Sequence, residues 1–600
     1  MVAFNGQGLG DGGSMSSRIA EELSAQTRDL VARFEERADA FVGRKDLMGL
    51  TAQLDPGSAS RFIREFLGEG EHTATGIDGS MDFDERLQMM LFYANAAAYS
   101  CPFRVGERTE FDLGSARRES SLSASAAIPL WAEDLGAVFS LEPEIDLELE
   151  HSMERIPNSF MTLGELYLAA RASEGSKVIL LDRPMSGTYS TLARDARNLL
   201  KQGDSKLVKW SGGKVSMLDI YLGLVLGAPQ MPLPNRRRFL ATRVLRHLMS
   251  GGRTHSELAS ELNATDAEVA RAARWLVGID KRYGGRLLSD RTPTRLALDE
   301  KAAGYWGRIS SLALEYSRSV FEARRHPLAV GGDEYLTILD VNTLSLFLLE
   351  LLHSRARESH VLVIGVAKDT TATDISRAVI PLSSENGFIS LVAPPPRLKN
   401  DRAFLTILSS ENPSLKTPWR TKGYDSALST IVSIQGKFVG ARKTVSRERL
   451  FARSFFQLRS LKSDPAIRSQ VFLFDRIYDE RYDSGSVRKA VVMENGTASE
   501  IEPYLEGREL SGLSNASLYL LSLMDNPEVF EAFGHNQLLY LADKAVKAEV
   551  RMLRSSLRGV ADLRVGGVTR RKKIFGLITT YREQRAEAEQ SRMRAGGRTG

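Results

Sequence analysis

Two short apolar segments that each carry an aspartate near their end, with a helix between them, constrain the fold of this chain most strongly. The first, TATGIDGS at Thr73–Ser80, is typical of a strand and places Asp78 before two small residues. The second, KVILLD, starts at Lys177, and Asp182 stands where it gives way to the turn RPMSG. A helix is predicted between them, from about Ser159 to Glu174. Strand, helix and strand in this order predict an α/β fold built on a mixed sheet.

Composition restricts the class of protein further. At 600 residues, with 42% hydrophobic and 26% charged residues, the chain has the balance of a globular protein of two or three domains. The net charge of +5 permits nucleic-acid binding without demanding it. The single cysteine, Cys101, excludes a disulfide framework within the chain and favours a reducing compartment. Neither a signal peptide nor a run of 18 apolar residues is found, so we expect a cytoplasmic protein that does not bind membranes.

The chain divides into five predicted regions. They are an N-terminal helical region (1–70), the first part of an α/β core (71–235), an insertion (236–300), the second part of the core (301–557) and a basic C-terminal tail (558–600). In the first region we expect one charged amphipathic helix from Ser17 to about Leu50. Further elements are predicted as a strand in 87–100 that follows a hairpin connection, a helix over 340–357, a strand from 360, strands near 429–435, 454–461 and 470–474, and a helix over 536–557.

The insertion has a pattern of its own, marked off by Pro232 and Pro234. Three helices are predicted in FLATRVLRHLMSGG, THSELASELN and TDAEVARAARWLVGI. The second opens with Thr254 and Glu257 and the third with Thr265 and Glu268, the spacing of a capping box. RYGGRLLSDRTPTRLAL reads as a hairpin. Three helices and a hairpin in so short a segment predict a winged-helix-like module.

Basic residues gather on and after the third helix of this module. They indicate salt-dependent phosphate contacts with DNA, although winged helices also serve as protein-docking modules. The basic run near the C-terminus is either a DNA contact or a solvated end. The residues concerned are Arg271, Arg274, Lys281, Arg282, Arg286, Arg291 and Arg295 in the module, and Arg570, Arg571, Lys572 and Lys573 near the C-terminus.

Three acidic residues are the candidates for chemistry. Asp78 and Asp182, each at the expected end of a buried strand, would share a divalent cation if their strands are neighbours, because Mg²⁺ and Mn²⁺ prefer carboxylate oxygens. The alternative is that each aspartate caps its own turn. Glu165, in the helix segment LGELYLAARA, would be the third ligand if that helix packs on the sheet; otherwise it is a solvated helix glutamate.

These segments together resemble the NurA nucleases, which work with the HerA hexameric DNA translocase. The resemblance runs through GIDGS, the helix with its early glutamate, ILLDRPMSG, VLVIGVAKD and FGHNQLLYLADKAVKAEV, from about residue 73 to 550. It implies an RNase H-like fold and degradation of DNA with Mn²⁺ or Mg²⁺. Departures from the family pattern are Arg183-Pro184 after the second aspartate and the inserted module.

The resemblance also implies roles for individual residues. Asp78, Glu165 and Asp182 would be the metal ligands, and Lys368 would lie near the scissile phosphate unless it is a solvated lysine. Asp543 would occupy the acidic-or-histidine position of the terminal motif, with His535 as the nearby alternative; the list of expected catalytic residues is Asp78, Glu165, Asp182, Lys368, Asp543 and His535.

Two alternative functions are therefore expected. The first is a nuclease that hydrolyses single- and double-stranded DNA at ends, as a homodimer acting with a HerA-like hexameric ATPase. The sequence has no GxxxxGK[ST] loop, so the motor would be a partner. The second is a non-catalytic DNA-binding or adaptor protein that uses the winged-helix module. Convergence of the carboxylates would favour the first, and wide separation the second.

Overall fold

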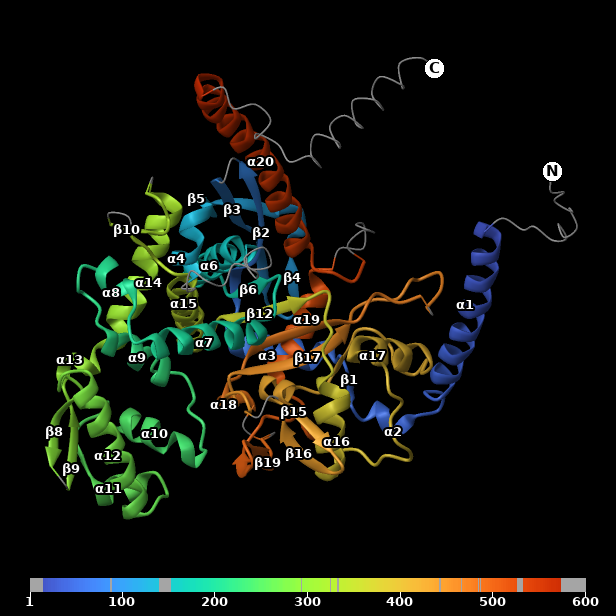
Figure 1. Ribbon diagram of the computed structural model, residues 1–600. Coiled ribbons are helices and arrows are strands. Elements are labelled where there is room, and N and C mark those ends of the chain that lie inside the picture. The colour runs from blue at the N-terminus through green and yellow to red at the C-terminus, as the bar shows by residue number, and fades with distance from the viewer. Residues whose placement is uncertain are drawn as a thin grey trace, which may run out of the picture.

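The computed structural model describes residues 15–572 except 87–88, 140–152, 293, 324, 332–333, 442–443, 466, 484, 486 and 526–532. Within these residues the chain is built around one mixed sheet of 11 strands (Figure 1). The strand order is β1-β13-β17-β18-β12-β6-β2-β3-β4, with β14 beside β17 and β5 beside β3. The strands are β1 Thr51–Gln53, β2 Gly70–Arg86, β3 Met89–Val105, β4 Thr109–Phe111, β5 Arg117–Trp131, β6 Val178–Leu181, β12 Leu362–Ala367, β13 Trp419–Thr421, β14 Tyr424–Asp425, β17 Phe451–Gln457 and β18 Phe472–Ile477.

The centre of the sheet is parallel and its flanks are antiparallel. β6 pairs in parallel with β2, where Leu181 lies opposite Ile77, and with β12, where Leu181 lies opposite Gly365. Every residue of β6 and β12 is buried, as expected for short parallel strands covered on both faces. The carboxyl ends of these two strands therefore lie at the same level, beside the middle of the long strand β2.

Helices cover both faces of this centre. On one face lie α6 Arg155–Ala172, α7 Met185–Gln202 and α15 Ile338–Ser359, and Ile77, Ile179 and Leu181 point into that core. On the other face lie α3 Pro56–Leu67, α19 Gly512–Leu523 and α20 Gln537–Lys572, and Val178 and Leu180 point into a second core. Successive strand residues alternate between the two cores, because side chains of a strand point to opposite faces in turn.

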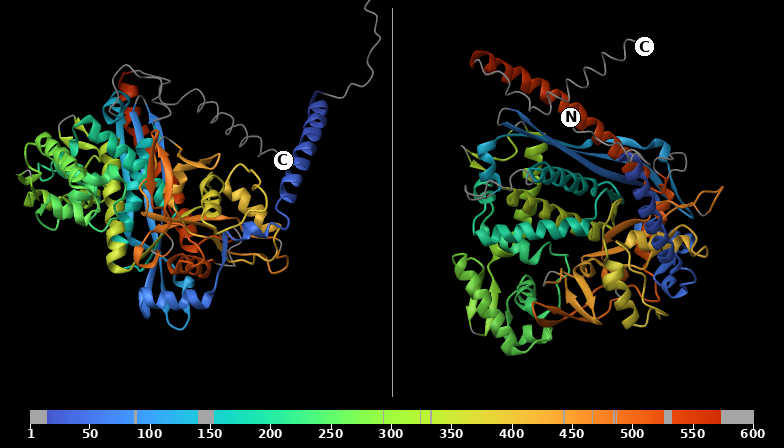
Figure 2. Two further views of the ribbon diagram at one scale, coloured as in Figure 1. Left: turned by 90° about the horizontal axis from the view of Figure 1, so that it is seen from below. Right: turned by 45° about the vertical axis from the view of Figure 1, so that its right-hand side comes forward.

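The predicted insertion forms three helices and a three-stranded antiparallel sheet with the order β7-β9-β8. Its elements project from the rest of the molecule (Figures 1 and 2). The capping boxes predicted at Thr254 with Glu257 and at Thr265 with Glu268 are both confirmed. The elements are α10 Leu240–Leu248, β7 Arg253–Thr254, α11 His255–Glu261, α12 Asp266–Arg282, β8 Leu288–Thr292 and β9 Arg295–Leu298.

The remaining regular elements are peripheral to the central sheet. They are α1 Met15–Asp39, α2 Lys45–Met48, α4 Leu135–Phe139, α8 Lys206–Trp210, α9 Met217–Leu226, α13 Glu300–Ala303, α14 Tyr305–Glu322, β10 Ala329–Gly331, β11 Glu334–Tyr335, η5 Ile375–Val379, α16 Ile380–Glu385, α17 Asp401–Ser410, β15 Ile431–Ile434, β16 Lys437–Gly440, α18 Glu480–Asp483, β19 Ala490–Glu494 and β20 Thr497–Ile501, with short 3-10 turns at 113–115, 132–134, 237–239 and 426–430. None of the described helices has the length and apolar character needed to cross a membrane.

Three expectations from the sequence are wrong in their boundaries. The amphipathic helix predicted over 17–50 ends at Asp39, and Phe41 and Leu47 beyond it are buried against the α/β core. The helix predicted to end at 557 continues to Lys572, so 558–572 is helix rather than tail; Lys573 and the residues after it lie outside the described residues. RPMSG is not a simple turn, because α7 begins at Met185.

The prediction that Asp78 ends a strand is also wrong. β2 continues through Gly79 and Ser80 to Arg86, paired along its whole length with β3. A glycine fits at position 79 because Glu165 and Met161 pack against it: a Cβ there would lie within about 3 Å of both side chains. The hairpin connection expected in the stretch from Gly79 to Arg86 is wrong for the same reason, because these residues belong to β2; residues 87–88 lie outside the described residues.

Candidate metal centre

Two of the predicted acidic residues lie side by side on one face of the sheet. Asp182 directly follows Leu181, the last residue of β6, and its backbone N–H donates to the carbonyl of Ile77 at 3.2 Å. Since Ile77 and Leu181 both point into the α15 side, alternation turns Asp78 and Asp182 to the α20 side. Asp78 itself lies in the middle of β2. The end of the neighbouring strand, β6, brings Asp182 beside it.

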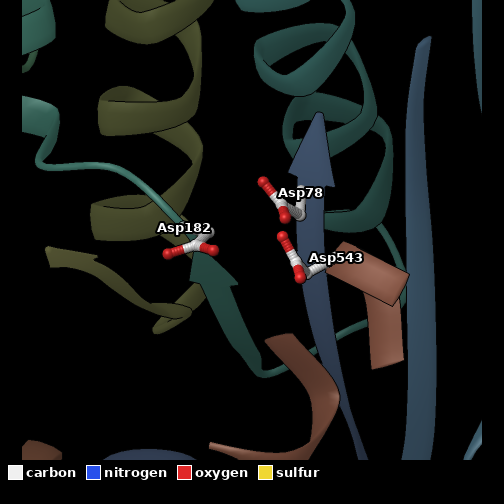
Figure 3. A group of neighbouring side chains, drawn as sticks. All are labelled: Asp78, Asp182 and Asp543. Atoms are coloured by element: carbon white, nitrogen blue, oxygen red, sulfur yellow. The ribbon is translucent and has the colours of Figure 1, made fainter. Parts of the chain in front are cut away.

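Helix α20 adds a third carboxylate. Asp543 on its second turn points at Asp78 and Asp182, and one oxygen from each of the three residues lies within 4.8 Å of the others (Figure 3). The helix comes this close because Gly76 has no side chain: a Cβ there would lie 2.7 Å from the Cβ of Leu538. Divalent cations with oxygen ligands require such a convergence of carboxylates.

The rest of the contact between β2 and α20 is complementary in charge. Asp82 accepts from Arg554 at 2.9 Å, and Asp84 accepts from Arg558 at 2.8 Å. Asp78, on the same face of the same strand, meets Asp543 instead. Like charges in a half-buried interface are unfavourable unless they share a proton or a cation. The contact of Asp78 with Asp543, which itself pairs with Lys547 at 2.6 Å, thus differs from the aspartate–arginine pairs at Asp82 and Asp84.

Burial and neighbouring charges perturb the pKa values of these groups. Desolvation, with the charges of Asp182 and Glu165, raises the pKa of Asp78 to about 9. Desolvation also raises the pKa of Asp182, against the opposing effect of Lys368. For Asp543, desolvation is outweighed by a hydrogen bond from Lys547 and by the charge of Lys368, so its pKa is lowered. With a pKa of about 9, Asp78 keeps its proton at neutral pH, and binding of a divalent cation would displace that proton.

Lys368 also reaches this centre. It follows β12, and its Nζ donates to Oδ2 of Asp182 at 2.5 Å. Desolvation would lower its pKa, but Asp182, Asp543 and Asp78 outweigh that effect and raise it. Lys368 is thus a fully charged ammonium at the edge of the carboxylate group, and the alternative of a freely solvated lysine does not apply.

Glu165 lies at the same level but on the opposite face of β2. It is only 3% exposed, and it forms an ion pair with Arg183, which also donates to Thr162 at 2.7 Å. Desolvation raises the pKa of Glu165 to about 7, opposed by Arg183. The carboxylate approaches the strand at Gly79, one residue from Asp78, but it is not in the close group of three oxygens among the described residues.

His535 lies in the segment just before α20 and stacks on Phe472 with ring centroids 5.6 Å apart. Desolvation, with the charge of Lys368, lowers its pKa to about 3. His535 is therefore a neutral imidazole near the centre. Its Nε2 is buried and has no hydrogen-bond partner among the described residues.

The basic residues predicted to bind DNA are not part of this centre; they lie on the insertion. Arg271, Arg274, Lys281 and Arg282 are exposed on α12, and Arg286 is exposed on the turn after it. Trp275, beside the first two, is 47% exposed. Arg291 instead pairs with the buried Asp280 at 3.0 Å, so it supports the fold of the module.

The sequence indicated Asp543 only through the family resemblance, and not as the third member of the close group of carboxylates. The available signal was LADKAVKAE, where an aspartate interrupts the apolar face of a helix. Sequence reasoning also missed Asp475, in FLFDRI, a fully buried acid in the middle of strand β18. An aspartate in an otherwise apolar strand needs a partner, and that partner is described below.

Fold and site together define an α/β protein whose described residues include a partly buried group of three carboxylates that could hold a metal ion. No protein-family model matches the chain, and no curated protein matches it.

Solved structures of NurA nucleases are similar to the chain. The NurA nuclease from Sulfolobus solfataricus is 10% identical, over 93% of this chain and 99% of that one, with a TM-score of 0.37. The structure of NurA bound to dAMP and manganese is 11% identical, over 92% of this chain and 98% of that one, with a TM-score of 0.37. The structure of NurA with manganese is 11% identical, over 89% of this chain and 98% of that one, with a TM-score of 0.32. At these values the functional assignment rests on the residues of the centre itself.

Proposed function

We propose that this chain is a divalent-metal-dependent nuclease that hydrolyses phosphodiester bonds of DNA. One observation carries the proposal: Asp78, Asp182 and Asp543 bring three oxygens within 4.8 Å of one another, in an interface where Asp82 is paired with arginine. The donors are all carboxylate oxygens, which fits Mg²⁺ or Mn²⁺ and not a soft metal. The RNase H-like core that the sequence resemblance implies is part of this proposal.

The residues present can support phosphodiester hydrolysis. Asp78, Asp182 and Asp543 would hold the cation, which when bound would supply Lewis-acid stabilisation of the phosphate. Lys368, held against Asp182 at 2.5 Å, is placed to offer its ammonium to a non-bridging phosphate oxygen. His535 is neutral, so it would donate or accept a hydrogen bond rather than contribute a charge. Glu165, which approaches β2 from the opposite face, would join these ligands only by leaving its ion pair with Arg183.

The test is Mn²⁺-dependent plasmid nicking together with Mn²⁺ binding to the purified protein. We expect Asp78→Asn and Asp543→Asn each to lower the Mn²⁺-dependent, chelator-sensitive nicking by about 100-fold or more. Asp82→Asn is the matched control, because it changes the same residue type on the same face of the same strand outside the centre. Full nicking activity in Asp78→Asn or Asp543→Asn would contradict the assignment.

The adaptor hypothesis predicted that the carboxylates would lie far apart. Asp78 and Asp182 instead lie in one close group, so this observation favours the nuclease. An adaptor would bind DNA without Mn²⁺-dependent cleavage, and the same nicking assay distinguishes the two.

We further propose that the insertion is a winged-helix module that contacts DNA through α12. The support is the order helix, strand, helix, helix, strand, strand and the exposed basic residues of α12. A homodimer and a HerA-like hexameric ATPase are the proposed partners. Sedimentation of the purified chain, alone and with such an ATPase, tests both.

A further inference from the structure

The loop that carries Asp182 is held in place by a carboxylate from another part of the chain. Asp475 lies in β18, which is separated from β6 by β12. Its Oδ1 accepts from the backbone N–H of Met185 at 3.0 Å, and its Oδ2 accepts from the N–H and the hydroxyl of Ser186 at 2.7 and 2.5 Å. The side chain is fully buried.

These contacts pass over β12 at a glycine. A Cβ on Gly365 would lie 2.5 Å from Oδ1 of Asp475 and about 3 Å or less from two backbone atoms of the Asp182 loop, the carbonyl oxygen of Arg183 and the nitrogen of Met185. The loop therefore lies directly on the backbone of β12 and is clamped there from the far side by Asp475. Contacts of this kind hold the loop backbone in place, and with it the orientation of the side chain that the loop carries.

Asp475 also supplies the helix cap that α7 lacks. α8, α9, α11, α12 and α15 each begin with a serine or threonine of their own that caps the first turn. α7 begins after Pro184, which provides no side-chain cap. Its first turn is capped instead from β18, by a buried charge whose desolvation is costly. Asp401 holds the start of η5 in the same way, accepting from the N–H of Ile375 at 2.7 Å and from the N–H and hydroxyl of Ser376 at 3.1 and 2.9 Å. What sets Asp475 apart is that the helix it caps starts three residues after Asp182.

We propose that Asp475 is a positioning residue that fixes Asp182 for divalent-cation binding. It touches neither the cation site nor substrate, and it acts through Met185 and Ser186 on the backbone of the 182–186 loop. This inference rests on the proposed metal-dependent function. Residues that hold metal ligands in place typically change metal affinity by about 10–100-fold when altered.

The experiment measures Mn²⁺ binding to the full chain by electron paramagnetic resonance, and the Mn²⁺ concentration for half-maximal nicking. Asp475→Asn loses one acceptor oxygen, and we expect its Mn²⁺ affinity and half-saturation to weaken by about tenfold, with nicking largely restored at high Mn²⁺. Asp340→Asn is the matched control. Asp340 is also a buried carboxylate that caps a helix, accepting from Thr337 and from Ser205, but at the start of α15.

A merely structural role would lower the unfolding temperature in both variants and leave Mn²⁺ affinity unchanged in both. That result would overturn the inference. If Asp475→Asn does not fold, Ser186→Ala removes only the hydroxyl bond, and we expect about threefold weaker Mn²⁺ binding; unchanged binding in that folded variant would also overturn it. Failure of the wild-type chain to bind Mn²⁺ would instead refute the proposed function, so the two failures are distinguishable.

Discussion

At the scale of single residues, the fold brings three carboxylates together in a partly buried centre, which is unfavourable without a bound cation. Asp78 meets Asp543 and Asp182, whereas Asp82, four residues along the same strand, meets Arg554. Binding sites often reduce stability in this way, because groups arranged for a ligand are poorly satisfied without it. The effect can be measured through the proton that the metal-free site retains.

Replacing Asp78 should remove a pH dependence of stability. The folded pKa of Asp78, about 9, lies above its ordinary value of 3.8, so the folded chain keeps a proton that the unfolded chain releases. Its contribution to stability is thus present below about pH 4 and is lost as pH rises toward 9. In chelator, we expect Asp78→Asn to unfold a few degrees higher than wild type at pH 8, with the difference shrinking toward pH 5. Parallel unfolding temperatures from pH 5 to 8 would contradict this.

Residue roles could be predicted only where a strand end revealed them. Asp182 and Lys368 directly follow the buried strands β6 and β12, as the apolar runs before them indicated. Asp78 was expected at a strand end and lies mid-strand, because the extent of β2 depends on pairing with β3, which local sequence does not specify. The face of β2 that Glu165 approaches depends on where α6 packs, and that is a tertiary choice as well.

At the scale of elements, α20 decides whether the centre exists. The helix carries Asp543 and lies along β2, anchored at one end by the contact of Leu538 with Gly76 and at the other by Arg554 and Arg558. The sequence indicated this helix but ended it too early, at 557, because the polar residues beyond lack the periodicity that marks a packed face. What sets its position is a glycine on a strand more than 450 residues away.

Gly76→Ala should therefore displace α20. The added Cβ would lie 2.7 Å from the Leu538 Cβ and 3.0 Å from its carbonyl carbon, so the backbone must move. We expect a loss of about 1–3 kcal/mol in stability and weaker Mn²⁺ binding, because Asp543 moves with the helix. Gly559→Ala is the control on the same helix, since its Cβ would have nothing within 4 Å, and it should keep or raise stability. Wild-type unfolding temperature and Mn²⁺ affinity in Gly76→Ala would show that the close approach is not required.

At the scale of the whole molecule, buried ion pairs and hydrogen bonds attach the insertion to the α/β core. Arg236, just before α10, is 3% exposed, pairs with Glu448 and donates to Glu494 at 2.9 Å, which ties the insertion to the small sheet that contains β19. On its other side, Arg246 donates to the carbonyl of Leu226 at 2.6 Å. The sequence indicated the elements of the insertion because their caps are local, but not the attachment through Arg236, whose partners Glu448 and Glu494 lie 212 and 258 positions away.

The exposed basic residues of α12 should add salt-dependent DNA affinity without changing the cleavage reaction. We expect Arg271→Ala/Arg274→Ala to reduce the slope of log affinity for duplex DNA against log salt by about 2, because each exposed arginine that contacts a phosphate releases one counterion. Mn²⁺-dependent cleavage of a short oligonucleotide at saturating concentration should be unchanged, since neither residue belongs to the carboxylate centre. Arg397→Ala/Lys399→Ala, an equal change of charge at two exposed residues between α16 and α17, is the control and should leave the slope as in wild type. Equal slopes for the two double variants would assign the basic face of α12 to another role, and a loss of oligonucleotide cleavage in the first alone would mean that the insertion contributes to the reaction itself.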